Sequence, residues 1–256
     1  MHVIDRHVYA NRGRGVDPAH KAALVLLVLA LCLLLDRPMV GLLACAWMWV
    51  LSSLWAGLPT GVFGRVLLAQ GSFLVLAVAG VALSAGTAFP AGVSWVVHVG
   101  PLAVWASFGS VDTALHLATR ALGGTAALDF LVLTTPLVDI VELLRRLRIP
   151  SVLIDIVALT YRFIFILLES LDRMHNAQDS RLGYSSFGNA VKSAGLLGSR
   201  LFVDSYQRSK RLQIALDSRG YSGDLQGLTP SYRTDRSLWW LGAAATATLL
   251  IGRVLI

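Results

Sequence analysis

Two arginines stand in matched surroundings within the one large polar segment of this chain. Ala-Gln-Asp-Ser-Arg ends at Arg181 and Ala-Leu-Asp-Ser-Arg ends at Arg219, and Gly-Tyr follows each within three residues. A guanidinium keeps its charge and presents a planar set of donors that can bind a carboxylate through two hydrogen bonds. Each arginine is therefore a candidate docking residue for a partner protein. We call Ser180-Arg181-Leu182 the first Arg motif and Ser218-Arg219-Gly220 the second.

Helix capping is the simpler explanation for either motif alone. Helices often end with a basic residue in the last turn, which meets the negative end of the helix dipole, and with a Gly just beyond. The two copies nevertheless share an Asp, a Ser and a following Tyr, which no capping rule requires. Their flanking residues differ, which argues against a longer structural repeat. The pair therefore indicates a duplicated docking element at two helix ends.

Catalytic motifs are absent from the sequence. It contains no Gly-x-x-x-x-Gly-Lys-Ser/Thr loop for ATP, and no His-Glu-x-x-His, Gly-x-Ser-x-Gly or Cys-x-x-Cys. Cys32 and Cys45 lie in apolar stretches without His or Cys at metal-ligand spacing, so we expect neither a metal site nor a disulfide. We expect no catalytic residue and no cofactor in this chain.

Three ionisable residues offer a different function. Asp112, His116 and Arg120 recur at every fourth position and share one helix face. An Asp beside a His can relay protons, as a stand-alone secondary transporter or channel requires. The simpler alternative to a proton relay, which we favour, is that this helical turn lies at the outer membrane edge, where these residues are solvated or pair with one another. An intramembrane enzyme would need a catalytic pair at depth, and Asp129 has no apparent partner.

Composition predicts the elements that must position these residues. Of the 256 residues, 55% are hydrophobic and 14% charged, which is typical of an integral membrane protein. We expect an all-α membrane protein with about five transmembrane helices, at residues 22–35, 39–55, 66–83, 111–135 and 237–256. Residues 89–108, rich in Trp, favour an aromatic belt or re-entrant segment.

The first apolar block is shorter than the roughly 20 residues that a span needs. Lys21 and Asp36 must then snorkel, or the bilayer must thin. A cleavable signal peptide is the alternative, but Asp36-Arg37-Pro38 leads straight into the second apolar block, as a tight hairpin would.

Basic residues predict the topology. Of 22 Lys and Arg, 14 lie between Pro136 and Arg236 and 4 lie before Ala22. The positive-inside rule places both regions in the cytoplasm. Residues 1–135 then hold a cytoplasmic segment and four spans, residues 136–236 a cytoplasmic coupling region, and residues 237–256 the last span. Nucleic acid is not an expected partner, because the Lys and Arg residues lie next to the predicted transmembrane helices instead of alternating with aromatic residues.

The polar region is predicted to be helical. Between Ser151 and Arg181, Asp155, Arg162 and Glu169 recur every seven residues and lie on one helix face. The other residues are mostly apolar, so we expect this helix at the membrane interface, because a sixth crossing would put charges in hydrocarbon. Residues 189–219 predict a second long helix, on which charged side chains pair along one face. A short amphipathic piece, residues 137–149, precedes both.

The chain resembles a known family at these positions. Leu-Val-Leu-Thr-Thr-Pro at 131–136, Tyr-Arg-Phe-Ile at 161–164 with Glu169, and the two Arg motifs are similar to the core of the transmembrane T component (EcfT) of energy-coupling factor transporters. The N-terminal residues 4–21 look like the cobalt-type branch, the CbiQ proteins. The likeness covers most of the chain. The family motif is most often Ala-Arg-Gly or a near variant, whereas this chain has Ser-Arg-Leu and Ser-Arg-Gly, so the central Arg is kept in both copies.

The resemblance implies a coupling subunit of an ATP-driven importer, for cobalt ions, in a bacterial inner membrane with a cytoplasmic N-terminus. The two helix ends would each insert into one of two ABC-type ATPase subunits, which carry ATP and Mg²⁺. The interfacial helices would pass their motion to the bundle and to a separate substrate-capturing membrane subunit, CbiM-like, with or without a small accessory subunit. Asp155, Arg162 and Glu169 would hold the interfacial helix in the cytoplasmic layer instead of binding substrate.

Overall fold

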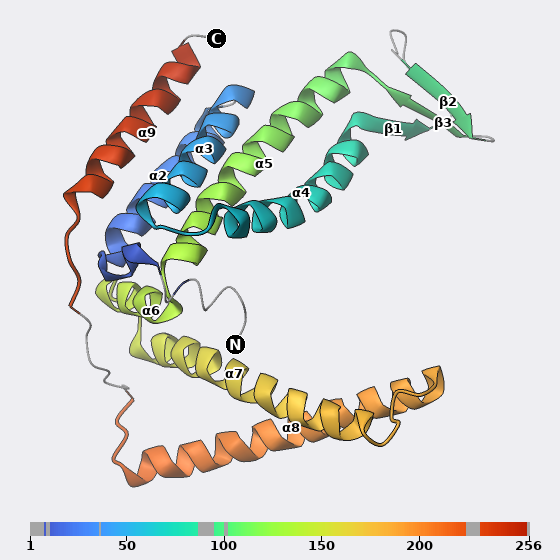
Figure 1. Cartoon of the computed structure of the whole chain (residues 1–256), viewed down its shortest axis with the longest axis vertical. Coiled ribbons are helices and arrows are strands. Elements are labelled where there is room, and N and C mark those ends of the chain that lie inside the picture. The colour runs from blue at the N-terminus through green and yellow to red at the C-terminus, as the bar shows by residue number, and fades with distance from the viewer. Residues whose placement is uncertain are drawn as a thin grey trace. The chain divides into compact units, whose positions relative to one another are not determined.

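The computed structural model describes residues 8, 11–35, 37–86, 95–99, 102–223 and 231–254. The chain divides into two compact units (Figure 1). Residues 2–136 and 231–256 form the first, which we call the bundle unit. Residues 137–230 form the second, which we call the hairpin unit.

The bundle unit is built from the predicted apolar blocks. Its helices are α2 (Pro18–Leu34), α3 (Pro38–Val50), which continues as the π-helical turn η2 (Leu51–Trp55), α4 (Thr60–Ala82), α5 (Phe108–Thr134) and α9 (Arg236–Val254), after a 3-10 turn, η1 (Arg12–Gly15). Pro38–Trp55, α4 and α5 are long and apolar enough to cross a membrane, and α2 is apolar but shorter. The prediction of a helical membrane protein is confirmed.

Local sequence explains where these helices begin. The Asp17 side chain accepts a hydrogen bond from the Ala19 N–H at 2.9 Å, and Pro18 takes the first helical position of α2. Pro38 opens α3 in the same way. Ser107 and Ser110 form a capping box at the start of α5.

Helix α5 is the centre of the bundle and packs against α3, α4 and α2. Its residues Ala126, Phe130 and Leu133 are buried. Gly41 of α3 and Gly123 of α5 let two backbones meet, because a Cβ on Gly123 would lie 2.8 Å from the Gly41 carbonyl oxygen. Small residues at a crossing are the usual means by which membrane helices approach closely.

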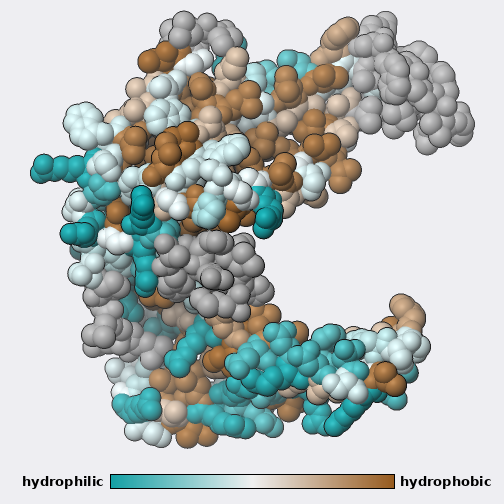
Figure 2. Space-filling view, in the orientation of Figure 1, coloured by the Kyte–Doolittle hydropathy of each residue, from teal (hydrophilic) through white to brown (hydrophobic). Residues whose placement is uncertain are grey.

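The outer face of α4 is strongly apolar. Leu68, Phe73 and Leu76 are more than two-thirds exposed, at 76%, 75% and 72%. Apolar side chains cover much of the bundle helices in Figure 2, whereas hydrophilic ones gather over α8. Such exposure is expected of a helix whose solvent is lipid.

Lys21 does not snorkel as predicted. Its side chain is 0% exposed, and its Nζ donates to the carbonyl oxygen of Thr134 at 3.1 Å. The carbonyls at the C-terminal end of α5 attract this cation, because they form the negative end of the helix dipole. Asp36 lies outside the described residues.

A small antiparallel sheet stands where an aromatic belt or re-entrant segment was predicted. Its strands are β1 (Leu83–Gly86), β2 (Trp95–Val99) and β3 (Leu102–Ala106), in the order β1-β3-β2. Leu83 pairs with Ala106, and Val99 pairs with Leu102. The Val and Trp content of β2 and β3 favours strands and was the available signal. Residues 89–94, 100 and 101 lie outside the described residues.

The hairpin unit contains three helices: α6 (Leu137–Arg146), α7 (Ser151–Asp179) and α8 (Phe187–Ser218). By length and hydropathy α7 could itself cross a membrane. It nevertheless packs against α6 and α8 in this unit. Its location at the membrane interface stays a prediction.

Candidate docking site at two helix ends

The first Arg motif follows the last turn of α7. Ser180 Oγ donates to the carbonyl of Asn176 at 2.8 Å, and Leu182 adopts a left-handed φ of 58°. Gly183 is required by space, because a Cβ there would lie 2.8 Å from both the Gln178 carbonyl oxygen and Ser193 Oγ. The chain therefore turns sharply just after Arg181.

The second Arg motif ends α8 in a similar way. Ser218 Oγ donates to the carbonyl of Ile214 at 2.7 Å, and Gly220 has a φ of 72°. A left-handed φ of this kind favours Gly. The Tyr221 N–H then donates to the Leu216 carbonyl at 3.0 Å.

The shared Ser and Tyr have structural roles that the sequence did not reveal. Each Ser hydroxyl donates to a carbonyl four residues earlier in its helix. Tyr184 Oη donates to Gln178 Oε1 at 2.9 Å, and Tyr221 Oη donates to Asp155 Oδ2 at 2.7 Å. These contacts shape the two turns and give the shared Ser and Tyr a structural role.

Both arginines are exposed. Within the part of the chain that the structure describes, neither guanidinium makes an ion pair or hydrogen bond. A capping arginine would bond the last carbonyls of its own helix. Two exposed cations are therefore available at defined turns.

The two motifs lie at opposite ends of a helical hairpin. Hydrogen bonds hold the antiparallel helices α7 and α8 and the turns after them together: Ser193 Oγ donates to the Gly183 carbonyl at 2.9 Å, Arg208 Nη2 to Ser170 Oγ at 2.9 Å, and Tyr221 Oη to Asp155 Oδ2. Because a helix rises about 1.5 Å per residue, residues 155–179 separate the two motifs by roughly 35–40 Å. Figure 1 shows the two helix ends at opposite extremes of the pair.

The predicted polar face of α7 does not form one cluster. Asp155 is only 3% exposed and binds Tyr221. Glu169 is exposed and pairs with Arg173 of the same helix, 2.7 Å away. Arg162 is exposed and makes no hydrogen bond or ion pair with any of the described residues. Of these three residues, Asp155 alone contacts the turn after α8 within the described part of the chain.

Ser170 is the residue that sequence reasoning missed. It is 2% exposed, and its Oγ accepts from Arg173 Nη2 at 3.1 Å and from Arg208 Nη2 at 2.9 Å. Arg208 also pairs with Asp204 at 3.0 Å, which confirms the predicted pairing along this helix. The hydrogen bond from Arg208 lowers the pKa of Asp204 below its usual range.

The three ionisable residues of α5 do not form a relay. His116 Nε2 lies 3.8 Å from Asp112 Oδ1, and the Asp112 side chain is 73% exposed. Arg120 instead donates to the Leu33 carbonyl of α2. Asp129 was expected to lack a partner, but Gln70 Nε2 of α4 donates to its Oδ1 at 2.9 Å.

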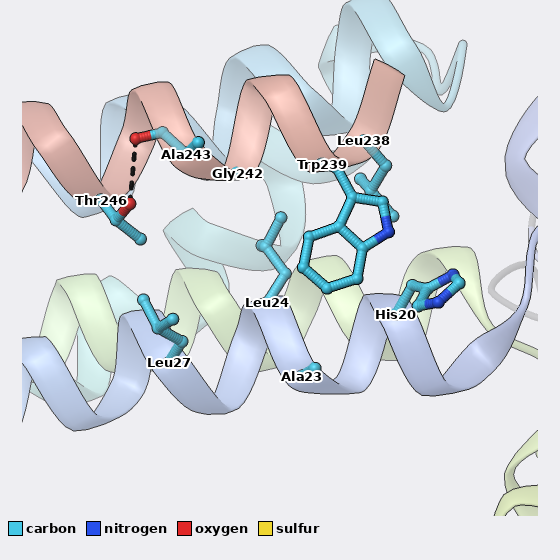
Figure 3. Close-up of a pocket in the computed structure, with 9 residues that line it drawn as sticks. All are labelled: His20, Ala23, Leu24, Leu27, Leu238, Trp239, Gly242, Ala243 and Thr246. Carbon is cyan, nitrogen blue, oxygen red and sulfur yellow. Dashed lines mark hydrogen bonds between the residues drawn. The ribbon is translucent and has the colours of Figure 1, made fainter. Parts of the chain in front are cut away.

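A pocket of about 270 Å³ lies between α2 and α9 (Figure 3). Its wall is mostly apolar, and at one end the rings of His20 and Trp239 meet edge to face, with centroids 5.3 Å apart. Among the described residues, no group of three His, Cys, Asp or Glu side chains is placed to hold a metal ion.

These features define a multi-pass helical membrane protein with a polar helical hairpin that ends in two matched arginine turns. The chain matches the CbiQ family, described as cobalt transport protein, over residues 14–230. It therefore belongs to the CbiQ family and is a transmembrane component of a transporter.

Individual relatives support this assignment. The chain is 34% identical over 128 residues to the cobalt transport protein CbiQ of Salmonella typhimurium, which covers 50% of this chain and 57% of the relative. It is 35% identical over 114 residues to a putative fused cobalt transport protein CbiMQ of Methanocorpusculum labreanum, covering 44% and 19%. It is 28% identical over 148 residues to the energy-coupling factor transporter transmembrane protein EcfT of Staphylococcus aureus, covering 54% of each. The chain thus matches 57%, 19% and 54% of the lengths of these three relatives.

Proposed function

We propose that this chain is the coupling subunit of an ATP-driven importer for cobalt ions. In this proposal Arg181 and Arg219 each dock into one ATPase subunit. When ATP closes the ATPase dimer, the two helix ends that carry these arginines move together. The chain itself carries out no catalysis, because ATP and Mg²⁺ are bound by the partners. It is oriented with the N-terminus and the hairpin unit in the cytoplasm of a bacterial cell.

The observation that carries the proposal is the pair of exposed arginines at opposite ends of one hairpin, neither of which has a partner among the described residues. A single docking protein would need only one such turn, whereas a nucleotide-binding dimer presents the same groove twice. The separation of roughly 35–40 Å exceeds the reach of one small binding groove. The sequence also lacks a phosphate loop, which supports a separate chain as the one that binds ATP.

The contacts between α7 and α8 make the hairpin suitable for transmitting force. Buried Ser170 joins the helices near the middle, and buried Asp155 joins them at the end that carries Arg219. A displacement at either arginine therefore moves a braced pair of helices. Buried, satisfied polar contacts resist separation more than exposed ion pairs do.

Cobalt as the substrate rests on the names of the relatives and on the N-terminal likeness. The fused CbiMQ relative supports a CbiM-like membrane subunit as the partner that captures the ion. We propose that this partner, with or without a small accessory subunit, holds the metal. Asp155, Arg162 and Glu169 then serve the hairpin and its assembly, and substrate selectivity lies elsewhere.

Substitution of the two arginines tests the proposal. The variants Arg181→Ala, Arg219→Ala and the double variant are compared with Arg200→Ala, which removes an exposed arginine from the body of α8. Loss of one buried, charge-assisted contact costs about 2–5 kcal/mol, or roughly 30- to several-thousand-fold in affinity. Each single variant should retain less ATPase and import less Co²⁺, and the double variant should fail at both. Wild-type retention and uptake in the double variant would show that the helix ends are only caps.

A further inference from the structure

Both connections between the two units are fastened to one N-terminal segment. The chain leaves the bundle unit after α5, at residues 134–136, and returns to it before α9, at residues 231–235. Residues 11–21 contact both connections, and we call this segment the collar.

The exit from α5 is held by side chains of the collar. Pro136 has no N–H, so the last carbonyls of α5 lack one of the donors that would continue a helix. Lys21 Nζ donates to the Thr134 carbonyl at 3.1 Å, and Asn11 Nδ2 makes longer contacts of 3.4 and 3.3 Å to the Leu133 and Thr134 carbonyls. Lys21 and Thr134 are both 0% exposed. A buried cation thus meets the negative end of the central helix.

The return connection is held by the backbone of the collar. The Arg233 N–H donates to the Gly15 carbonyl at 2.8 Å, and the Asp17 N–H donates to the Arg233 carbonyl at 3.2 Å. Val16, between these two collar residues, is buried. Asp17 also caps α2, so the helix that carries Lys21 begins at the residue that holds the returning chain.

Further contacts join the collar to Trp55 of η2 and, through Trp55, to Asp235, just before α9. Trp55 Nε1 donates to Asp235 Oδ2 at 3.1 Å, and a Cβ on Gly13 would lie 2.7 Å from the Trp55 ring. Hydrogen bonds from Ser237 hold the pKa of Asp235 below its usual range, so this carboxylate stays charged at neutral pH. The collar, η2 and the start of α9 are therefore joined by one continuous set of contacts within the bundle unit.

We propose that the collar is the rigid seat through which movement of the hairpin unit reaches the membrane helices, with Lys21 as its positioning residue. If either connection were flexible, it would absorb the displacement of the hairpin unit. Because the collar binds both connections, it passes this displacement to α5, α2 and α9 together. This inference rests on the proposed coupling function. It adds a transmitting element that is separate from the docking arginines.

The test uses the assembled transporter in proteoliposomes and measures ATP hydrolysed per Co²⁺ imported. Lys21→Met keeps the apolar stem and removes the ammonium, Lys21→Gln keeps a shorter donor, and Lys192→Met removes an exposed lysine as the matched control. We expect normal ATPase retention in all three. The ATP cost per ion should rise roughly tenfold in Lys21→Met and less in Lys21→Gln, as loss of a charge-assisted hydrogen bond allows. A purely structural role would lower the yield of complex and leave this ratio unchanged.

Hydrogen exchange in the same complexes gives a local reading. The amides of Thr135, Asp17 and Arg233 should exchange roughly 10- to 100-fold faster in Lys21→Met, while those within α3 and α4 keep their wild-type rates. A wild-type ATP cost per ion overturns the proposal, as does uniformly faster exchange. Failure of both Lys21 variants to reach the membrane, while Lys192→Met does, also overturns it, because Lys21 would then serve the fold alone. If the wild-type chain retains no ATPase subunits, the coupling function itself fails.

Discussion

Replacing Tyr221 with Phe should loosen the end of the hairpin that carries Arg219. The substitution keeps the ring and removes only the hydroxyl that donates to Asp155 Oδ2 at 2.7 Å. Asp155 is 3% exposed, so the carboxylate oxygen loses a donor in a place that water reaches poorly. The ring of Tyr221 keeps its volume, so packing should change little.

The magnitude follows from the burial of the two partners. A hydrogen bond to a charged group contributes about 1.5–3 kcal/mol. Tyr221 itself is 37% exposed, which lets water replace part of the lost contact. We therefore expect a cost of about 1–2 kcal/mol, which is roughly a 5- to 30-fold change in the local opening equilibrium.

Hydrogen exchange at the Arg219 and Tyr221 amides measures this opening, since both donate to the Leu216 carbonyl at 3.0 Å. Tyr184→Phe is the matched control, because it removes the corresponding hydroxyl from the first turn, where it contacts Gln178 Oε1 and His175 Nδ1. That control should affect only the first turn, and by about 0.5–1.5 kcal/mol. Unchanged exchange at the second turn in Tyr221→Phe would refute the role given to this contact.

Three further predictions concern packing, pH and topology. Gly123→Ala should destabilise the bundle by about 1–3 kcal/mol through overpacking, whereas Gly71→Ala, which meets nothing within 4 Å, should be neutral or stabilising; equal melting temperatures would contradict the α3–α5 crossing. Because the pKa of Asp204 is depressed, its stabilising effect is present above the unfolded value of about 3.9 and is lost as the pH falls through the folded value; a carboxyl titration by NMR should show Arg208→Gln raising this pKa, and no change would contradict the pair. Ser185→Cys, in a background without native cysteines, should resist an impermeant thiol reagent on intact cells; labelling would reverse the proposed topology.

Features that depend on neighbouring residues could be predicted from the sequence. Each apolar block became a helix, because a long apolar run lets an α-helix satisfy its backbone in lipid. The ends of α7 at Asp179 and of α8 at Ser218 fell at the Arg motifs, where Gly allows the turn. The pairing of Asp204 with Arg208 followed from helical spacing alone.

Contacts between distant residues could not be predicted in this way. Lys21 finds Thr134 across 113 positions, Tyr221 finds Asp155 across 66, and Gln70 finds Asp129 across 59. Each depends on how helices pack, which spacing along one helix does not encode. The expectation that Lys21 snorkels treated α2 as an isolated span, whereas the buried end of α5 offers the ammonium an acceptor.

Native mass spectrometry of the complex purified through this chain tests the central claim most directly. Two ATPase subunits should accompany each wild-type chain, one should be lost preferentially in Arg181→Ala or Arg219→Ala, and both should be lost in the double variant. Arg200→Ala should keep the wild-type ratio, as the exposed control on α8. A wild-type complex with a single ATPase subunit, or a double variant that still carries two, would contradict the account of the hairpin as a paired docking element.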